Sequence, residues 1–442
     1  MTLETIHADN RPHVVIIGAG FGGIWAAKEL ADQPVRVTLL DKNNYHTFQP
    51  LLYQVAAAEI EPEQIGYPVR GILRRMPNVT FTLAAVTAVD LTAQTVTTTQ
   101  ATLAYDYLIL ATGSVTQFFG TPGAAAHSFS LKTMEEGVRL RNHILTCFER
   151  AVHVPPAERR QLLTFVVVGG GPTGVEYAGA LSELVYGPLR KDFPELDMAD
   201  VSIVLLEAAG RVLGGMSESL SAYAARSLHK MKVVVQLEKR VTAVTGTAVT
   251  LHDGAQIPTN TVVWVAGVGG EGLARESGIE VLGNGRVSVL PTLQLPQHER
   301  VFAIGDLAAF PAADAASGHF LPMVAQVAIQ QGIHAAQNIG RHQLGVPLAP
   351  FHYWDKGSMA TIGRNKAVVD WHGRTFTGFL AWLIWGVIHI MYLIGFRNRI
   401  MVMLSWAWRY FTFEQTVRLI MPSSQAAWLA MAPEEVNETS AD

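Results

Sequence analysis

Cysteine is almost absent from this 442-residue chain, which contains only Cys147. A single thiol excludes an intrachain disulfide framework and any redox centre built from paired thiols, so Cys147 is expected to be structural. Charge is scarce as well, because Asp, Glu, Lys and Arg make up 16% of the residues and leave a net charge of −4. A slightly acidic chain of this kind is not expected to bind nucleic acid through phosphate contacts.

The N-terminal segment lacks an apolar core. Residues 1–11 are polar and contain nothing of signal-peptide length, so the chain is expected to stay in the cytosol. Low-complexity tracts and short-period repeats are also missing. The length predicts two to three domains, and a hydrophobic fraction of 49% is high for a soluble protein.

Two glycine-rich segments of the same kind each follow an apolar run. Gly18, Gly20 and Gly23 follow residues 14–17, and Gly169, Gly171 and Gly174 follow residues 165–168. In such a strand-to-helix turn the glycines permit a sharp bend, a close approach to a pyrophosphate and tight helix packing. The helix N-terminus then offers unpaired N–H groups to the phosphates. One copy is also compatible with a plain structural turn, but two predict two dinucleotides and electron transfer between them.

Each glycine segment is followed by an acidic residue at the end of the next apolar run. Asp41 ends the run 35–40, and Glu207 ends the run 201–206 after a longer crossover. A carboxylate at this position can hydrogen-bond a ribose diol and would repel a 2′-phosphate. The alternative is an ordinary solvated strand end, but its occurrence in both copies favours cofactor binding.

Three further apolar runs end in short polar signals. They are Ala111-Thr112-Gly113, Ala266-Gly267 and Ile304-Gly305-Asp306. A helical pattern over 324–341 follows the third. These runs predict an α/β fold with two Rossmann-like dinucleotide-binding domains and a distinct C-terminal region.

The C-terminal region is rich in tryptophan and arginine. The 22 residues between Arg374 and Arg397 carry no charge, and five of the nine tryptophans lie between Trp371 and Trp408. Aromatic and arginine residues at the edge of an apolar helical face are typical of a helix lying in a membrane interface. Beyond Arg399, one helical face would consist of Val402, Trp406, Tyr410, Phe413, Val417 and Ile420, and another of Ser405, Arg409, Thr412 and Thr416.

Three interpretations of this region compete. We favour a monotopic anchor on the membrane surface. A transmembrane helix over about residues 376–396 and a homodimer interface are the alternatives, and hydropathy alone does not separate them.

The order of these motifs resembles the two-dinucleotide-binding-domain flavoproteins, and four segments make the resemblance more specific. They are Asn44–Ala56, Gly169–Glu176, Ala325–Gln331 and Asp355–Arg364. Together they resemble the type II NADH:quinone oxidoreductases, which are single-subunit, non-pumping respiratory enzymes. Related disulfide reductases and sulfide:quinone reductases need reactive cysteines that this chain lacks.

The resemblance implies a division of the chain and its cofactors. Residues 12–127 and 271–345 are expected to form the FAD domain, residues 128–270 the NADH domain, and residues 346–442 a membrane-anchoring region with amphipathic helices. Bound FAD would take a hydride from NADH and pass two electrons to ubiquinone or menaquinone without any metal. The expected location is the cytoplasmic face of the cell membrane, with NADH, a membrane quinone and the lipid surface as partners.

The resemblance also implies which residues bind the two dinucleotides. Asp306 is expected to contact the ribityl chain of FAD, and Glu207 to favour NADH over NADPH. The full set is Gly18, Gly20, Gly22, Gly23, Asp41, Lys42, Ala111, Thr112, Gly113, Gly305, Asp306, Ala325, Gln326, Gly169, Gly171, Thr173, Gly174, Glu176, Glu207 and Gly267.

Four residues are implied in catalysis. Glu176 would orient NADH or relay protons, although it also suits the first turn of a helix. Gln326 and Gln330 share one helical face and would line the quinone pocket, the alternative being a plain polar face. Lys356 would stabilise the quinol anion unless it pairs with Asp355.

Two other functions remain open at this stage. The chain could reduce a soluble electron-transfer protein such as a ferredoxin, or it could be a non-enzymatic, NADH-sensing flavoprotein. His46 is expected to be structural under every interpretation.

Overall fold

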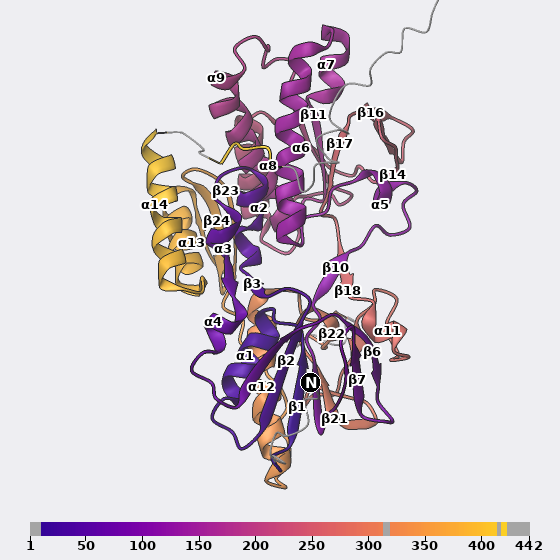
Figure 1. Cartoon of the computed structure of the whole chain (residues 1–442). Helices are drawn as coiled ribbons and strands as arrows, with labels where there is room; N and C mark the ends of the chain where they lie inside the picture. The colour runs from indigo at the N-terminus through magenta and orange to yellow at the C-terminus, as the bar shows by residue number, and fades with distance from the viewer. Residues whose placement is uncertain (1–9, 313–318, 413–416, 422–442) are drawn as a thin grey trace, which may run out of the picture.

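The computed structural model describes residues 10–312, 319–412 and 417–421. Two α/β units lie one above the other, and a C-terminal unit flanks their junction (Figure 1). The chain is therefore α/β with two dinucleotide-binding folds, as the sequence predicts.

The first unit is built on a six-stranded sheet whose centre is parallel. The strands, in spatial order, are β20 (Gln294–Leu295), β21 (His298–Ala303), β9 (Tyr107–Leu110), β1 (His13–Ile17), β2 (Arg36–Asp41) and β5 (Val79–Leu83). β1 and β9 are buried along their whole length, as expected for parallel strands covered on both faces. The sheet contains strands from both segments that were expected to form the FAD domain, residues 12–127 and 271–345.

Helices α1 (Phe21–Leu30) and α12 (Ala325–Gln343) cover this sheet side by side. The same parts of the chain contain the smaller elements β3 (Tyr45–Thr47), η1 (Gln49–Leu51), α2 (Leu52–Ala56), α3 (Pro62–Ile65), β4 (Gly66–Pro68), α4 (Val69–Leu73), β6 (Val86–Asp90), β7 (Thr95–Thr98), β8 (Thr102–Ala104), α11 (Leu273–Glu276), β19 (Val287–Ser288), η3 (Gly305–Leu307) and β22 (Ala308–Ala309).

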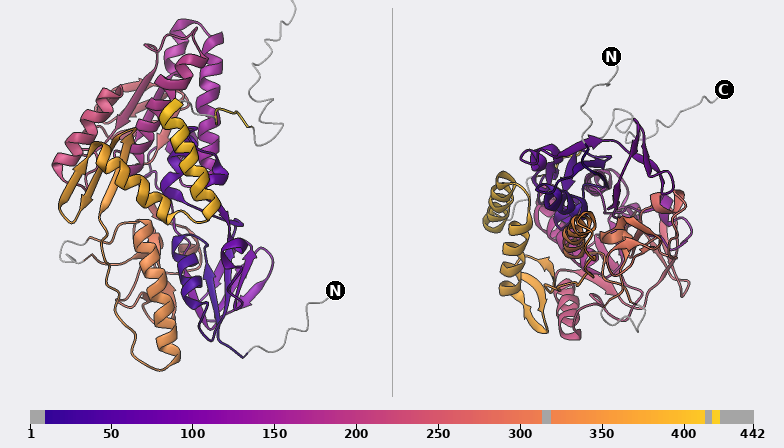
Figure 2. Two further views of the ribbon diagram at one scale, coloured as in Figure 1. Left: turned by 90° about the vertical axis from the view of Figure 1, so that its left-hand side faces the viewer. Right: turned by 90° about the horizontal axis from the view of Figure 1, so that it is seen from below.

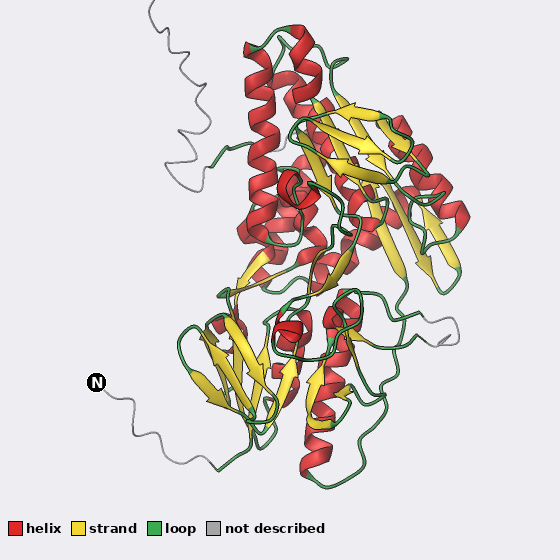
Figure 3. Cartoon of the chain, turned by 90° about the vertical axis from the view of Figure 1, so that its right-hand side faces the viewer, coloured by secondary structure: helices red, strands yellow, loops and turns green. Residues whose placement is uncertain are grey.

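The second unit has a four-stranded parallel sheet in the order β13 (Val233–Gln236), β12 (Ser202–Leu206), β11 (Thr164–Val168) and β17 (Thr261–Trp264). Its other elements are α5 (Ala124–His127), α6 (Met134–His153), α7 (Pro156–Leu162), α8 (Pro172–Leu184), the π-helix η2 (Val185–Leu189), α9 (Arg190–Asp192), α10 (Glu218–Lys230), β14 (Val241–Val244), β15 (Ala248–Leu251) and β16 (Gln256–Pro258). Figure 3 shows the strands of the two units as separate groups.

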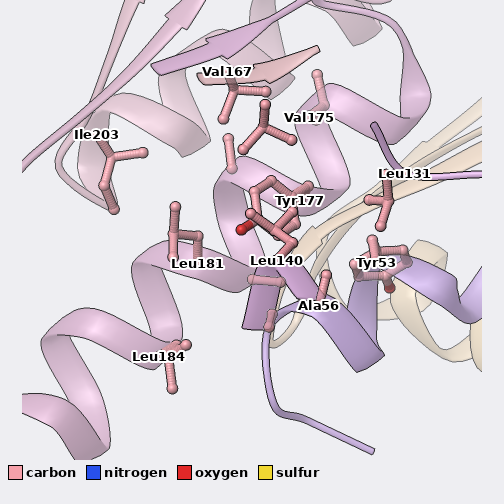
Figure 4. Close-up of a cluster of buried hydrophobic side chains, with 14 of the residues drawn as sticks. Tyr53, Ala56, Leu131, Leu140, Val167, Val175, Tyr177, Leu181, Leu184 and Ile203 are labelled. Carbon is pink, nitrogen blue, oxygen red and sulfur yellow. The ribbon is translucent and has the colours of Figure 1, made fainter. Parts of the chain in front are cut away.

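The two units are joined by β10 (Ser114–Thr116) and β18 (Val268–Gly270), which pair antiparallel between them. The largest core cluster also crosses the junction, because α2 of the first unit packs against α6 and α8 of the second. Figure 4 shows Tyr53 and Ala56 of α2 beside Leu140 of α6 and Tyr177 of α8. A shared core of this kind fixes how the two units face each other.

Helix α6 illustrates how local sequence sets an element of this core. Thr133 and Glu136 form a reciprocal capping box, in which the Thr133 hydroxyl accepts from the Glu136 N–H at 3.2 Å. The Glu136 carboxylate accepts from the Thr133 N–H at 3.0 Å, so two N–H groups at the helix start are satisfied.

The C-terminal unit begins with a sheet that the sequence did not predict. It contains β23 (Ser358–Gly363), β24 (Lys366–Trp371) and β25 (Arg374–Thr377), and two helices follow, α13 (Gly378–Tyr392) and α14 (Phe396–Thr412). The left panel of Figure 2 shows these helices together on the outside of the molecule. In the part of the chain that the structure describes, no helix combines the length and the apolar character needed to cross a membrane.

The prediction that the face of α14 containing Val402 and Trp406 meets the membrane is wrong. Val402 is fully buried, and the Trp406 indole N–H donates to Gln54 Oε1 at 2.9 Å. These side chains therefore face the protein, since an apolar helical face packs on a core as readily as on lipid. Phe413 and Thr416 of the expected helix lie outside the described residues.

A different set of apolar side chains points outward. They are Phe379, Leu380, Leu383, Val387 and Met391 of α13 and Phe396, Met403, Leu404, Trp408 and Phe411 of α14, all of which are about half exposed or more. We call this set the α13–α14 apolar face.

Candidate functional site

The first glycine turn needs glycine at two positions for different reasons. Gly18 has a φ of +106°, and a Cβ there would lie 2.3 Å from the carbonyl oxygen of Ala111. A Cβ on Gly23 would lie 1.8 Å from the carbonyl oxygen of Gly18. The space beside Gly20 is open, as an approaching pyrophosphate requires.

Asp41 braces this turn from the end of β2. Its Oδ2 accepts from the Ala19 N–H at 2.7 Å, and its Oδ1 accepts from the Asn43 N–H at 2.7 Å. Burial raises the pKa of the carboxyl, against these hydrogen bonds. The buried ring of His46 contacts the carbonyl oxygen of Ala19 through Nδ1 at 2.9 Å, which fits a structural part in the same turn.

The second glycine turn repeats this construction. Gly169 has a φ of +114°, and a Cβ there would lie 2.5 Å from Ala266 Cα. A Cβ on Gly174 would lie 1.8 Å from the Gly169 carbonyl oxygen, while nothing lies within 4 Å of one on Gly171. The two turns therefore present the same open backbone cradle.

Glu207 occupies the place that Asp41 has in the first unit. Its Oε2 accepts from the Gly170 N–H at 2.6 Å, and its Oε1 accepts from the Ala209 N–H at 2.8 Å. Each carboxylate oxygen has a second lone pair, so either acidic residue can still accept a ribose hydroxyl. The acidic strand ends thus shape the turns as well as offering acceptors, which the sequence did not predict.

Helix α12 returns to the first turn through a close glycine contact. A Cβ on Gly332 would lie 2.3 Å from the carbonyl oxygen of Gly22, so the backbones of α1 and α12 nearly touch. Gln331 of α12 accepts the Gly305 N–H at 2.7 Å. Asp306 Oδ2 accepts a hydrogen bond of 2.5 Å from the Ser114 hydroxyl and lies 3.9 Å from Lys132 Nζ. Residues from distant parts of the sequence thereby meet at one turn.

Two buried polar atoms near the first turn are not satisfied by the described part of the protein. The Thr112 hydroxyl and Gln326 Oε1 are buried and have no hydrogen-bond partner in the described part of the chain. Gly113 has a φ of +78° and open space around it. Buried polar groups are normally paired, so these atoms fit contacts with a bound ligand, the Thr112 hydroxyl with a flavin and Gln326 with a flavin or the quinone beside it.

The remaining expected dinucleotide contacts are less informative. Lys42 and Thr173 are exposed at their turns, and Ala325 is the first residue of α12. A Cβ on Gly267 would lie 2.2 Å from Phe119 Cζ, so this glycine allows the Phe119 ring to pack on the backbone.

The two glutamines of α12 differ in their surroundings. The Gln330 amide exchanges two hydrogen bonds of 3.0 Å with the backbone of Trp354. Gln326 keeps its unpaired oxygen, and Val327 between them is buried. Gln330 therefore fixes the following loop, whereas Gln326 is the one with a free acceptor.

Lys356 lies on that loop. Its Nζ donates to the Tyr392 hydroxyl at 2.9 Å and lies 5.5 Å from the Trp354 ring centroid. Asp355 instead accepts the Gly357 N–H at 2.9 Å. The lysine thus connects the loop held by Gln330 to the last turn of α13.

Glu176 is positioned by tight packing between α8 and β23. A Cβ on Gly179 would lie 1.8 Å from the carbonyl oxygen of Ile362, so the strand lies directly on the helix. The Thr361 N–H donates to Glu176 Oε1 at 3.3 Å. Burial nevertheless raises the pKa of Glu176 to about 8, although Thr361 and the nearby Trp385 indole oppose the shift.

A charged cluster that no sequence pattern predicts lies behind Glu176. Arg409 forms ion pairs with Glu59 and, at 3.9 Å, with Glu183. The Glu59 side chain is only 2% exposed. Glu59 lies just after α2 and Arg409 on α14, so only the folded chain brings them together.

Comparison with known proteins identifies relatives over most of the chain. Residues 12–332 match the model of the pyridine nucleotide-disulphide oxidoreductase family, and residues 355–413 match the NDH2 C-terminal domain. The type II NADH:quinone oxidoreductase Ndh of Mycobacterium tuberculosis is 41% identical over 419 residues, which cover 91% of this chain and 89% of that protein. A protein of the same description from Staphylococcus epidermidis is 31% identical, over 84% of this chain and 92% of that one.

The fold agrees with a solved structure. NDH2 of Plasmodium falciparum, described in complex with NADH, superposes with a TM-score of 0.85 and covers 93% of this chain and 100% of that one at 18% identity.

Proposed function

The chain belongs to the type II NADH:quinone oxidoreductases, and from this premise we propose which residues carry the two half-reactions and how the enzyme reaches its quinone. The enzyme is an FAD-dependent oxidoreductase that uses NADH and a quinone. The supporting observation is the pair of carboxylate-braced glycine turns, each with an open cradle.

The turn at Gly18 is proposed as the FAD seat, because α12 and the Gly305–Asp306 strand end complete it. The turn at Gly169 is proposed as the seat of exchangeable NADH. Residues 12–127 and 271–345 would then form the FAD domain and residues 128–270 the NADH domain. Glu207 would accept the NADH ribose hydroxyls and repel the 2′-phosphate of NADPH.

Bound FAD supplies the group that accepts a hydride from NADH and passes an electron pair to quinone. The chain's own groups bind and orient. The N–H groups of the two helix starts would hold the pyrophosphates, and Thr112 and Asp306 would hydrogen-bond the flavin and its ribityl chain. Glu176, at the start of α8, holds a proton close to the reacting groups.

On the quinone side, Gln326 is proposed to donate to or accept from the quinone head group. Gln330 would hold the Trp354 loop in place, since its amide is already used there. Lys356 would supply positive charge for the developing quinol oxygen, with Tyr392 orienting its ammonium group.

The α13–α14 apolar face is proposed to lie in the membrane interface on the cytoplasmic side. Its members recur along both helices, and Trp408 and Arg397 suit the boundary between lipid and water. A second copy of this chain is the alternative occupant of the face. Dimer formation in solution that is lost on substituting the face, without vesicle binding, would favour that alternative.

The quinone assignment is tested by separating the half-reactions. Gln326→Ala is expected to raise the quinone KM by about fivefold, because one neutral hydrogen bond contributes about 1 kcal/mol. Flavin reduction by NADH, followed anaerobically by stopped-flow absorbance, should stay within about twofold of wild type. Gln337→Ala, on the exposed side of the same helix, is the matched control. Equal damage to both half-reactions would refute the assignment.

A further inference from the structure

Behind Glu176 lies a small cavity between the flavoprotein core and the two C-terminal helices. Its walls come from α2, α8, the end of β23, α13 and α14, and the free volume is about 20 Å³, enough for roughly one water molecule. The titratable and charged groups that face it are Tyr53, Glu59, Glu176, Glu183, Arg364, Arg409 and Tyr410.

The helix α8 brings two of the three carboxylates to the same side of the cavity. Glu176 and Glu183 are seven residues apart, which is close to two helical turns, and Ala180 lines the cavity between them. Glu59 approaches from the segment after α2. Arg409 bridges Glu59 and Glu183 from α14.

The charges around the cavity do not balance. Three carboxylates face two guanidinium groups, so the fully ionised set carries a net charge of −1. A buried net charge is costly, and the binding of a single proton removes it. The pKa directions agree, because burial raises the pKa of Glu59 to about 7 and that of Glu176 to about 8.

The reaction needs one proton from outside. NADH and a quinone contain one proton fewer than NAD⁺ and the quinol, so each turnover must take up one proton. We propose that the carboxylates of Glu59, Glu176 and Glu183 around Arg409 hold this one exchangeable proton and supply it to the quinone through Glu176. This inference rests on the proposed placement of Glu176 near the reacting groups.

The proton passes between named groups, so that each bond broken is matched by a bond formed. The O–H bond of the Glu176 carboxyl breaks as an O–H bond forms on the quinol oxygen. Glu176 regains the proton from Glu59 through the cavity. Glu183 and Arg409, with side chains 22% and 18% exposed, connect Glu59 to solvent. Glu59 and Glu183 are thus positioning and relay residues, while Glu176 is the proposed donor.

The first test uses the flavin-loaded enzyme without turnover. Infrared spectra recorded against pH should show a protonated buried carboxyl at pH 7 that is lost above about pH 9. In Glu59→Gln, which removes one negative charge and keeps the shape, the apparent pKa of this signal should fall by at least about one unit. Glu61→Gln, an exposed change two residues away, is the matched control and should leave the signal unchanged.

The second test follows the reaction. The rate of flavin reoxidation by quinone should decline with rising pH in the wild type, and the decline should begin about one pH unit lower in Glu59→Gln. Flavin reduction by NADH should be unaffected. If Glu59→Gln does not fold, Glu183→Gln and the wild-type infrared titration carry the same test.

Several results would overturn the proposal. A wild-type enzyme with no protonated carboxyl at pH 7 would do so, as would a Glu59→Gln variant indistinguishable from Glu61→Gln. An infrared shift with an unchanged pH profile would mean that the cavity holds a proton without supplying it, which also contradicts the proposal. These outcomes leave the Gln326 result untouched, so a failure here is distinguishable from a failure of the quinone assignment.

Discussion

At the scale of single residues, the acidic strand ends perform two tasks with one carboxylate. Asp41 and Glu207 each accept two backbone N–H groups and so hold the glycine turns, and their remaining lone pairs are proposed to accept ribose hydroxyls. A substitution there tests coenzyme choice only if the turn survives. Glutamine removes the charge and keeps one acceptor oxygen for the turn, but its NH2 group cannot accept the second backbone N–H. The stability of the variant is therefore measured beside its coenzyme preference.

Glu207→Gln is expected to raise the ratio of kcat/KM for NADPH to that for NADH by about tenfold, or about 1.4 kcal/mol, because it removes the repulsion of the 2′-phosphate. Steady-state kinetics with both coenzymes measure the ratio. Glu238→Gln, an exposed change nearby, should leave the ratio unaltered. The same ratio in Glu207→Gln and wild type would mean that Glu207 does not select the coenzyme.

Glu176 makes stability depend on pH in a predictable direction. Its carboxyl has a pKa of about 8 in the folded protein against a normal value of 4.5, so between these values the folded state binds a proton that the unfolded state does not. Stability therefore falls as pH rises through this window.

Glu176→Gln should show a smaller decline, which the raised pKa of Glu59 still produces. Relative to wild type, the free energy of unfolding of the variant should rise by at least about 1 kcal/mol between about pH 5 and pH 8. Urea unfolding at several pH values measures the difference. Parallel pH dependences of the two proteins would contradict the raised pKa of Glu176.

At the scale of elements, α14 is held to the core by buried polar contacts as well as by packing. Arg409 joins Glu59 and Glu183, Trp406 donates to Gln54, and Asn398 donates to the carbonyl oxygen of Gly66 at 2.9 Å. The outer side of the same helix is apolar. The helix therefore presents its polar groups inward, opposite to an ordinary surface helix.

Arg409→Met should destabilise the protein by about 3–5 kcal/mol, since it leaves Glu59 buried without its cation. Arg397→Met, an exposed arginine on the same helix, is the control and should cost less than about 0.5 kcal/mol. The double variant Glu59→Gln/Arg409→Met should recover part of the loss. Additive effects of the two changes in urea unfolding would show that the pair does not interact.

The elements also show what sequence alone could predict. The glycine turns were predictable because their spacing is a local pattern: Gly23 and Gly174 are each required by the carbonyl oxygen of the glycine five residues earlier. The contacts of Gly18 with Ala111 and of Gly169 with Ala266 appear only in the folded chain. The inward face of α14 was not, because Val402 and Trp406 are equally suited to a core or to lipid. The Glu59–Arg409 pair had no sequence signal, since its partners meet only in the tertiary structure. The β23–β25 sheet had no alternating signal in the sequence, because β23 and β24 each bury three consecutive residues.

At the scale of the whole molecule, the proposed sites form a route for electrons. The unit proposed to bind NADH lies above the unit proposed to bind FAD, and the C-terminal helices lie beside their junction (Figure 1). The α13–α14 apolar face is proposed to give the enzyme access to quinone in the membrane, separately from the chemistry at the flavin.

The most direct test compares a water-soluble short-chain quinone with a long-chain quinone confined to lipid vesicles. The variant Leu383→Gln/Met391→Gln/Leu404→Gln removes apolar side chains from the exposed side of both helices, and Leu344→Gln, an exposed change at the end of α12, is the control. The triple variant is expected to oxidise NADH with the soluble quinone at the wild-type rate. With the vesicle quinone it should be at least about tenfold slower than the wild type. Equal rates for the triple variant and the wild type with the vesicle quinone would contradict the proposed role of the α13–α14 apolar face.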